Sequence, residues 1–170
     1  GEKISKYKSK EVAKKLGLLP QSSTAPDGIT VANLVAHGRY PYQSFMQQWT
    51  EADEEAVLKA MELTKTTELS HRYVDELSGG QRQRVWVAML LAQQTPLLLL
   101  DEPTTYLDIA HQIELLELLT DLHEQGHTLV AVLHDLNQAA RYATHLIAMK
   151  AGEVVAQGHP SQIVTEELIK

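Results

Sequence analysis

Leu97-Leu98-Leu99-Leu100-Asp101-Glu102 is the stretch that decides the fold, because four consecutive leucines run directly into two adjacent carboxylates. A run this apolar, with Pro96 before it and acidic residues after it, predicts a buried β-strand. Asp101 is then expected at the C-terminal edge of a sheet, where α/β folds bind their ligands. Two adjacent carboxylates repel each other unless a cation or its water ligands lie between them, so the pair also indicates a cation site. The alternative is that Asp101 only caps the next turn and that Glu102 is a solvated neighbour.

The segment Leu77-Ser78-Gly79-Gly80-Gln81 ends sixteen residues before the leucine run. Its two glycines leave backbone N–H groups uncovered where a helix is expected to begin, with Ser78 as the N-cap. Such an N-terminus attracts phosphate through its free donors and its dipole. A plain glycine turn that caps a helix is the alternative for this segment alone. Together with Asp101 and Glu102, the segment indicates hydrolysis of a nucleotide.

The composition limits the class of protein. The chain has 170 residues, a formal net charge of −7 and no cysteine. We expect one soluble domain with a helical subdomain inside it. The acidic balance argues against nucleic acid as a partner, since phosphate neutralisation needs clustered Lys and Arg. No apolar stretch is long enough to span a membrane, and the lack of cysteine excludes disulfides and thiolate metal sites.

The apolar periodicity changes along the chain. Helices are expected to dominate residues 24–96, after a short helix over residues 9–17 that Gly17 ends. Short apolar runs then lie at 97–100, 128–133, 146–149 and 154–157, and they alternate with expected helices at about 108–125 and 135–142. This rhythm is typical of βαβ units in a mostly parallel sheet.

The motifs above, with Thr104-Thr105-Tyr106-Leu107-Asp108, resemble those of the ATP-binding subunit of ABC transporters. Residues 77–81 are similar to the signature motif, 97–102 to the Walker B strand with its catalytic glutamate, and 104–108 to the D-loop. The resemblance implies an α/β fold of the P-loop NTPase type, with a mostly parallel sheet and an inserted helical subdomain. It divides the chain into the end of the core with the Q-loop (1–23), the helical subdomain with the signature motif (24–96) and the Walker B and H-loop core (97–170).

The resemblance implies ATP and Mg²⁺ as cofactors and gives roles to single residues. Asp101 would hold the Mg²⁺ shell, and Glu102 would orient the attacking water or act as general base. Gln21 resembles the Q-loop glutamine, whose amide carbonyl contacts Mg²⁺, although a solvated loop glutamine is the alternative. His134 resembles the switch histidine that contacts the γ-phosphate and orients Glu102, although an ordinary strand-to-helix turn has the same local pattern.

The same resemblance implies a second ATPase subunit. In the family, the signature residues Ser78, Gly79, Gly80 and Gln81 face the γ-phosphate that the opposite subunit binds, which gives a head-to-tail dimer. Asp108 is expected to be the N-cap of the long helix after it. In the family, the same residue also couples the two nucleotide sites across the dimer.

A zinc-protease pattern, H-E-x-x-H, is present in His123-Glu124-Gln125-Gly126-His127. That chemistry needs both histidines on one face of a continuous helix. Gly126 is typical of a helix end, and His127 leads directly into the apolar run at 128–133. We therefore expect the two imidazoles to diverge and no zinc to bind.

Gly38-Arg39-Tyr40-Pro41 resembles the ABC subgroup that imports iron-siderophore complexes. Residues 28–50 are expected to meet transmembrane permease subunits, with Tyr40 and Tyr42 as exposed aromatic anchors. The resemblance implies a peripheral protein on the cytoplasmic face of the membrane, with a periplasmic or surface substrate-binding protein as an indirect partner. The alternatives are a soluble ABC ATPase of DNA repair or translation, and a non-catalytic interaction module.

One element of the family pattern, the Walker A sequence G-x-x-x-x-G-K-[ST], does not occur in these 170 residues. The early aromatic residue that stacks on adenine in the family also has no counterpart. We therefore expect the chain to be a fragment of a longer ATPase, cut at both ends. Without the amide nest and the lysine of the P-loop, nothing is expected to cradle the β- and γ-phosphates.

Overall fold

The computed structural model describes residues 2–44, 49–105 and 107–165. The chain divides into two compact units, Gly1–Val132 and Leu133–Lys170. The division at residues 23/24 and 96/97 stays a prediction.

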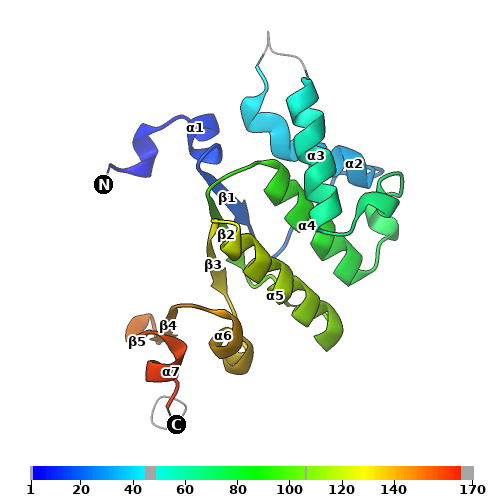
Figure 1. Ribbon diagram of the computed structural model, residues 1–170. Coiled ribbons are helices and arrows are strands. Elements are labelled where there is room, and N and C mark those ends of the chain that lie inside the picture. Colours follow the sequence, from blue (N-terminus) through cyan, green and yellow to red (C-terminus); the bar gives the residue numbers. More distant parts are fainter. Residues whose placement is uncertain (1, 45–48, 106, 166–170) are drawn as a thin grey trace. The chain divides into compact units, whose positions relative to one another are not determined.

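A parallel sheet organises the first unit, and its described strands are β1 (Leu16–Leu19), β2 (Leu97–Asp101) and β3 (Thr128–Val132). The leucine run forms β2, which lies between the other two strands (Figure 1). Leu19 pairs with Leu100, and Asp101 pairs with Val132. Leu98 and Leu100 are each 1% exposed, so the expected buried strand is confirmed for one of its two faces. On β1 and β3, Leu18 and Val130 are more than half exposed.

The N-terminal helix is shorter than expected over residues 9–17. After the 3₁₀ turn η1 (Ile4–Lys6), helix α1 covers only Ser9–Ala13, and Gly17 lies inside β1 rather than at a helix end. A Cβ on Gly17 would lie 2.6 Å from Cδ1 of Leu90 and 2.9 Å from Oγ1 of Thr95. Gly17 therefore allows the close packing of β1 on its neighbours, and the prediction that it ends a helix is wrong.

All described elements between β1 and β2 are helical. They are α2 (Val31–Ala36), the 3₁₀ segment η2 (His37–Tyr42), α3 (Glu51–Leu63), η3 (Thr67–Leu69), η4 (Val74–Glu76) and α4 (Gly79–Ala92). Figure 1 shows α2, α3 and α4 packed together beside the sheet. Their shared core consists of buried aliphatic side chains, among them Val31, Val35, Ala56, Ala60, Val85, Ala88 and Ala92.

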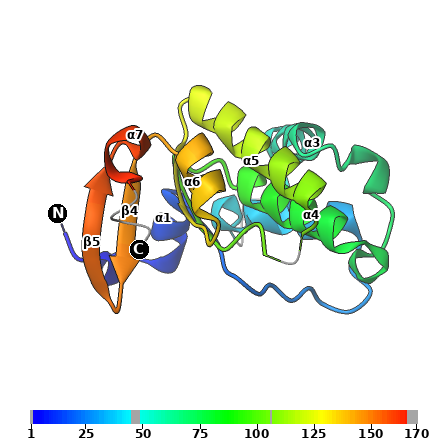
Figure 2. The same cartoon turned by 90° about the horizontal axis from the view of Figure 1, so that it is seen from below.

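Helix α5 (Ile109–Glu124) connects β2 to β3 and confirms the helix expected at 108–125. Its buried stripe consists of Leu115, Leu116, Leu119 and Leu122, which recur at helical spacing. Gly80 and Arg84 of α4 contact α5, and Figure 2 shows the two helices side by side. The N-terminal turns of α4 and α5 are therefore neighbours.

The second unit contains α6 (Leu136–Tyr142), β4 (Leu146–Lys150), β5 (Glu153–Gly158) and α7 (Pro160–Ile163). Strands β4 and β5 pair antiparallel, so the alternating βαβ rhythm does not extend to residues 146–157. Ala151 and Gly152 join them with φ values of 51° and 84°, as in a type I′ hairpin turn. A two-residue connection cannot hold the crossover that a parallel pair requires.

Candidate functional site

The strand register places two predicted site residues side by side. Gln21 and Glu102 each stand two residues after a member of the pair Leu19 and Leu100. Nε2 of Gln21 donates a hydrogen bond to Oε2 of Glu102 at 2.6 Å. Because parallel strands end at the same edge of their sheet, the backbone brings together two groups that are 81 residues apart in the sequence.

A second donor fixes the Glu102 carboxylate. Oγ1 of Thr105 donates to the same Oε2 atom at 3.1 Å, which sequence reasoning missed, although Thr105 stands within the D-loop motif. The backbone of Glu102 has a φ of 50°, in the left-handed region that a residue with a side chain seldom adopts. Such conformations concentrate at functional sites. Asp101 ends β2 and is exposed beside Glu102, as expected for the C-terminal edge.

Helix α4 begins where the signature motif predicts. Ser78 is its N-cap: Oγ of Ser78 accepts a hydrogen bond from the backbone N–H of Gln81 at 3.3 Å. Oε1 of Gln81 accepts one in return from the backbone N–H of Ser78 at 3.1 Å. Gly79 and Gly80 are the first two helical residues, so no β-carbon covers the amides at this end of the 14-residue helix. The arrangement suits an anion at the helix N-terminus.

Asp108 is the N-cap of α5, as predicted. Its Oδ1 accepts hydrogen bonds from the backbone N–H of His111 at 2.9 Å and from Nδ1 of the same histidine at 2.7 Å. The backbone hydrogen bond, followed by the side-chain one, holds the pKa of the Asp108 carboxyl below its usual value. Asp108 therefore stays a carboxylate under physiological conditions. Tyr106, which the resemblance places in the same motif, lies outside the described residues.

His134 lies in the second unit, in an exposed bend two residues after the end of β3 in the sequence. Asp135 next to it is the N-cap of α6 and accepts hydrogen bonds from the amides of Asn137 and Gln138. The strand-to-helix turn expected at His134 is therefore present. Its contact with the γ-phosphate and with Glu102 stays a prediction.

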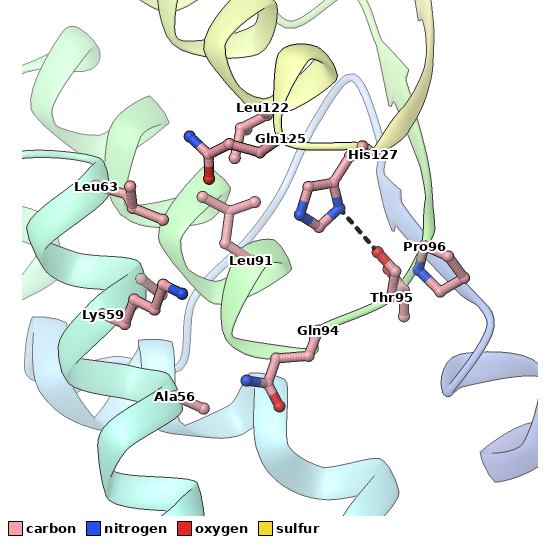
Figure 3. A pocket seen from close by; sticks show the side chains of 12 residues that line it. Ala56, Lys59, Leu63, Leu91, Gln94, Thr95, Pro96, Leu122, Gln125 and His127 are labelled. Carbon is pink, nitrogen blue, oxygen red and sulfur yellow. Dashed lines mark hydrogen bonds between the residues drawn. The ribbon is translucent and has the colours of Figure 1, made fainter.

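The H-E-x-x-H pattern does not lie on one helix. Helix α5 ends at Glu124, and Gly126 has a φ of 98°. Each imidazole contacts a main-chain carbonyl: Nδ1 of His123 contacts that of His127, and Nδ1 of His127 contacts that of Thr95, both at 3.2 Å. His127 and Thr95 line an open pocket of about 430 Å³ between α3, α4 and α5 (Figure 3). Thr95 and His127 precede β2 and β3, so this pocket lies at the strands' N-terminal edge, away from Gln21 and Glu102.

The segment Gly38-Arg39-Tyr40-Pro41 is mainly a packing element. Arg39 is 5% exposed, and its guanidinium donates to Oδ1 of Asp53 and to the carbonyl of Ala92, both at 2.8 Å. A Cβ on Gly38 would overlap the carbonyl oxygen of Met89. Sequence reasoning missed this buried ion pair, in which Asp53 also forms a capping box with Thr50 at the start of α3.

The two tyrosines of this segment have different surroundings. Tyr40 is 62% exposed, with Nζ of Lys10 at 4.4 Å from the centre of its ring. Tyr42 is partly buried; its hydroxyl donates to the carbonyl of Gln93 at 3.0 Å, and the Arg39 guanidinium lies 3.9 Å from its ring centre. The expected exposure is therefore confirmed for Tyr40 and wrong for Tyr42, while the role as anchors stays a prediction.

The comparison with known families agrees with the resemblance that the sequence motifs carry. The pattern of the family described as "ABC transporter" matches residues 1–105, and the chain belongs to this family. Within the described residues, no helix is long and apolar enough to cross a membrane.

Among its relatives, the chain is 62% identical to the ferric enterobactin transport ATP-binding protein FepC of Escherichia coli, over all of this chain and 63% of that protein. It is 55% identical to the achromobactin transport ATP-binding protein CbrD of Dickeya dadantii, over all of this chain and 64% of that protein. Among solved structures, the dimeric ATP-binding cassette MJ0796 with ADP and Pi has a TM-score of 0.77 at 28% identity, covering 94% of this chain and 70% of that one. The chain thus spans less than two thirds of the length of these curated relatives.

Proposed function

We propose that this chain provides the hydrolytic part of an ATP-binding subunit that drives import of iron-siderophore complexes. The observation that carries the proposal is the Glu102 carboxylate, held by Gln21 and Thr105 at the end of β2 and next to Asp101. A carboxylate fixed in this way at a sheet's C-terminal edge suits the orientation of a water molecule and the acceptance of its proton.

The donor set fits a nucleotide-bound Mg²⁺. Asp101 and the Gln21 amide supply the oxygen ligands that this hard cation prefers. When bound, Mg²⁺ neutralises charge that develops on the phosphates during transfer. Gln21 and Asp101 would orient this ion, while Glu102 would hold the attacking water.

The proposed cargo and partners follow from the relatives. Their names specify ferric enterobactin and achromobactin transport. We infer iron chelates as the cargo class, transmembrane permease subunits as partners through residues 28–50, and a peripheral location at the cytoplasmic face. A second ATPase subunit, head to tail, would place Ser78, Gly79, Gly80 and Gln81 opposite a nucleotide, and the relative with ADP and Pi is dimeric. A substrate-binding protein would take part indirectly.

A hybrid protein tests the proposal. In this hybrid, our chain replaces the matching 63% of the Escherichia coli relative, which is 62% identical over that part. The hybrid should hydrolyse ATP and restore ferric enterobactin uptake to cells without that relative. ATP hydrolysis without uptake would favour a non-transport ABC ATPase, and a folded hybrid without hydrolysis would favour an interaction module.

We predict that the 170-residue chain by itself does not bind MgATP measurably, although Gln21, Asp101, Glu102 and His134 are present. Most ground-state phosphate binding is expected from a Walker A loop, which this sequence does not contain. Binding at a ligand concentration of about 100 times Kd would stabilise the fold by about 2.7 kcal/mol and raise its Tm by several degrees. We expect no rise in millimolar MgATP, with the hybrid as the positive control. A clear rise for the chain alone would mean that another segment cradles the phosphates.

We predict that Tyr40→Ala in the hybrid weakens permease binding, because Tyr40 is the exposed aromatic side chain of the proposed contact. An aromatic anchor of this kind contributes enough for its loss to reduce affinity about 10-fold or more. Uptake should fall in parallel, while ATP hydrolysis by the free hybrid stays at its parent rate. Tyr73→Ala is a matched control, since Tyr73 is 49% exposed and lies outside residues 28–50. Equal losses of hydrolysis and uptake would refute the docking role.

A further inference from the structure

The imidazole of His111 contacts both the signature motif at the start of α4 and the D-loop motif at the start of α5. On one side, Nδ1 of His111 donates to Oδ1 of Asp108 at 2.7 Å. On its other side, the ring of His111 lies against Gly80: a Cβ on Gly80 would be 2.8 Å from Cδ2 and 2.9 Å from Cγ of the ring. Gly80 is the second helical residue of α4, and Asp108 is the N-cap of α5. The ring therefore fills the space between the first turns of the two helices.

We propose that His111 is a positioning residue, which sets the Asp108 carboxylate in a fixed relation to the signature residues at the start of α4. This inference rests on the proposed function, in which both groups act at nucleotide sites. His111 itself would touch neither nucleotide nor water. It would act by holding the Asp108 carboxylate in place. Because its ring fills the space beside position 80, only glycine fits there.

A second contact between the same helices supports a rigid connection. Nη1 of Arg84 on α4 donates to Oε2 of Glu114 on α5 at 3.2 Å. Arg84 is four residues after Gly80, and Glu114 is three residues after His111, so both contacts lie on the faces that the two helices turn to each other. Two points of contact, one turn apart, restrict both sliding and rotation of α4 against α5.

The requirement for glycine follows from the geometry. The Cβ of an alanine at position 80 would lie 2.8 Å from Cδ2, 2.9 Å from Cγ and 3.2 Å from Nε2 of His111. The ring would have to leave this position, and its Nδ1 bond to Asp108 would break. The backbone N–H of His111 would still cap α5, so the helix would keep its start while the side-chain contact is lost.

A double-mutant cycle on the 170-residue chain tests the contact. We expect Gly80→Ala to lower the Tm by about 3 °C or more, the usual consequence of overpacking in a chain of this size. In the His111→Ala background, the same substitution should cost less than half as much, because the ring is absent. His123→Ala, at the far end of α5, is the control background and should leave the cost of Gly80→Ala unchanged. If Gly80→Ala lowers the Tm equally in the parent chain, in His111→Ala and in His123→Ala, the proposal is wrong.

Side-chain replacements distinguish positioning from simple packing. The amide nitrogen of Asn occupies the place of Nδ1, whereas that of Gln occupies the place of Nε2. The backbone hydrogen bond from residue 111 should keep part of the lowering of the Asp108 pKa in every variant. His111→Asn should also keep the side-chain part in an NMR titration of the chain, while His111→Gln and His111→Ala should lose that part and give a higher Asp108 pKa. Equal Asp108 titration in the Asn and Gln variants would overturn the proposal, even if both are fully folded.

The hybrid gives the functional readout. His111→Ala should lower kcat for ATP about 10-fold with little change in KM, and His111→Asn, but not His111→Gln, should restore it. Unchanged kcat in His111→Ala would refute the positioning role. If the parent hybrid has no activity, the proposed function fails, while the Tm cycle and the Asp108 titration still decide whether His111 positions the two motifs.

Discussion

Replacing Glu102 by Gln in the hybrid should lower ATP turnover by about 10²- to 10⁴-fold, the range for loss of a positioned general base. The amide oxygen of Gln can still accept the hydrogen bonds that Gln21 and Thr105 donate, so the local geometry should survive. The amide cannot accept a proton from the attacking water. Nucleotide binding should therefore persist, and the expected product is a dimer with ATP trapped in it.

Single-turnover hydrolysis and size-exclusion chromatography with MgATP measure the two effects separately. Glu124→Gln, at the exposed C-terminal end of α5, is a matched control that should retain parent activity. Hydrolysis near the parent rate in Glu102→Gln would show that another group orients the water. Loss of ATP binding along with turnover would instead assign Glu102 a structural role.

The largest effect on stability is expected at Arg39. Its guanidinium and the Asp53 carboxylate form an ion pair at 2.8 Å, with side chains only 5% and 7% exposed. Arg39→Met would leave the Asp53 charge buried without its partner, which costs about 3–5 kcal/mol. The Tm of the 170-residue chain should fall by about 10 °C. Arg72→Met is the matched control, because Arg72 and Glu76 form an exposed pair at 3.9 Å that contributes little.

The double variant Arg39→Met with Asp53→Leu should be less destabilised than Arg39→Met alone, since no charge is left buried.

The pH dependence of the stability gives an independent check of the ion pair. Burial by itself would raise the pKa of Asp53, but hydrogen bonds from Arg39 and Thr50 and the Arg39 charge outweigh it and hold the pKa below 3.8. The pair should stabilise the fold at all pH values above 3.8, and this contribution should be lost as the pH falls through the lower folded pKa. A Tm of Arg39→Met equal to that of the parent chain would show that the Arg39–Asp53 pair contributes nothing to stability.

The sequence predicted those features that depend on local patterns. The leucine run forms β2, Ser78 and Asp108 cap the helices that they were expected to cap, and Gly126 follows the end of α5. Each of these signals involves a few neighbouring residues whose propensities agree with the tertiary fold.

The features that were missed or wrong depend on distant partners. Gly17 has the appearance of a helix end, but its role is set by Leu90 and Thr95, more than 70 positions away. Arg39 is typical of a surface residue in the sequence, but in the fold Asp53 and the C-terminus of α4 bury it. Nothing in the sequence around His111 specifies that its ring would meet Gly80. Such contacts become visible only when the fold brings the elements together.

The position of Glu102 relative to Gln21 has a consequence for how this chain can change over evolutionary time. Both residues lie two positions after the paired Leu19 and Leu100, so their hydrogen bond depends on the number of residues that follow this pair. Exchange of one aliphatic residue for another in the strands leaves this count intact. Insertion or deletion of a single residue between Leu100 and Glu102 would change this number and should break the hydrogen bond to Gln21. Exchanges among the aliphatic residues of these strands are therefore compatible with the site, whereas changes in strand length are not.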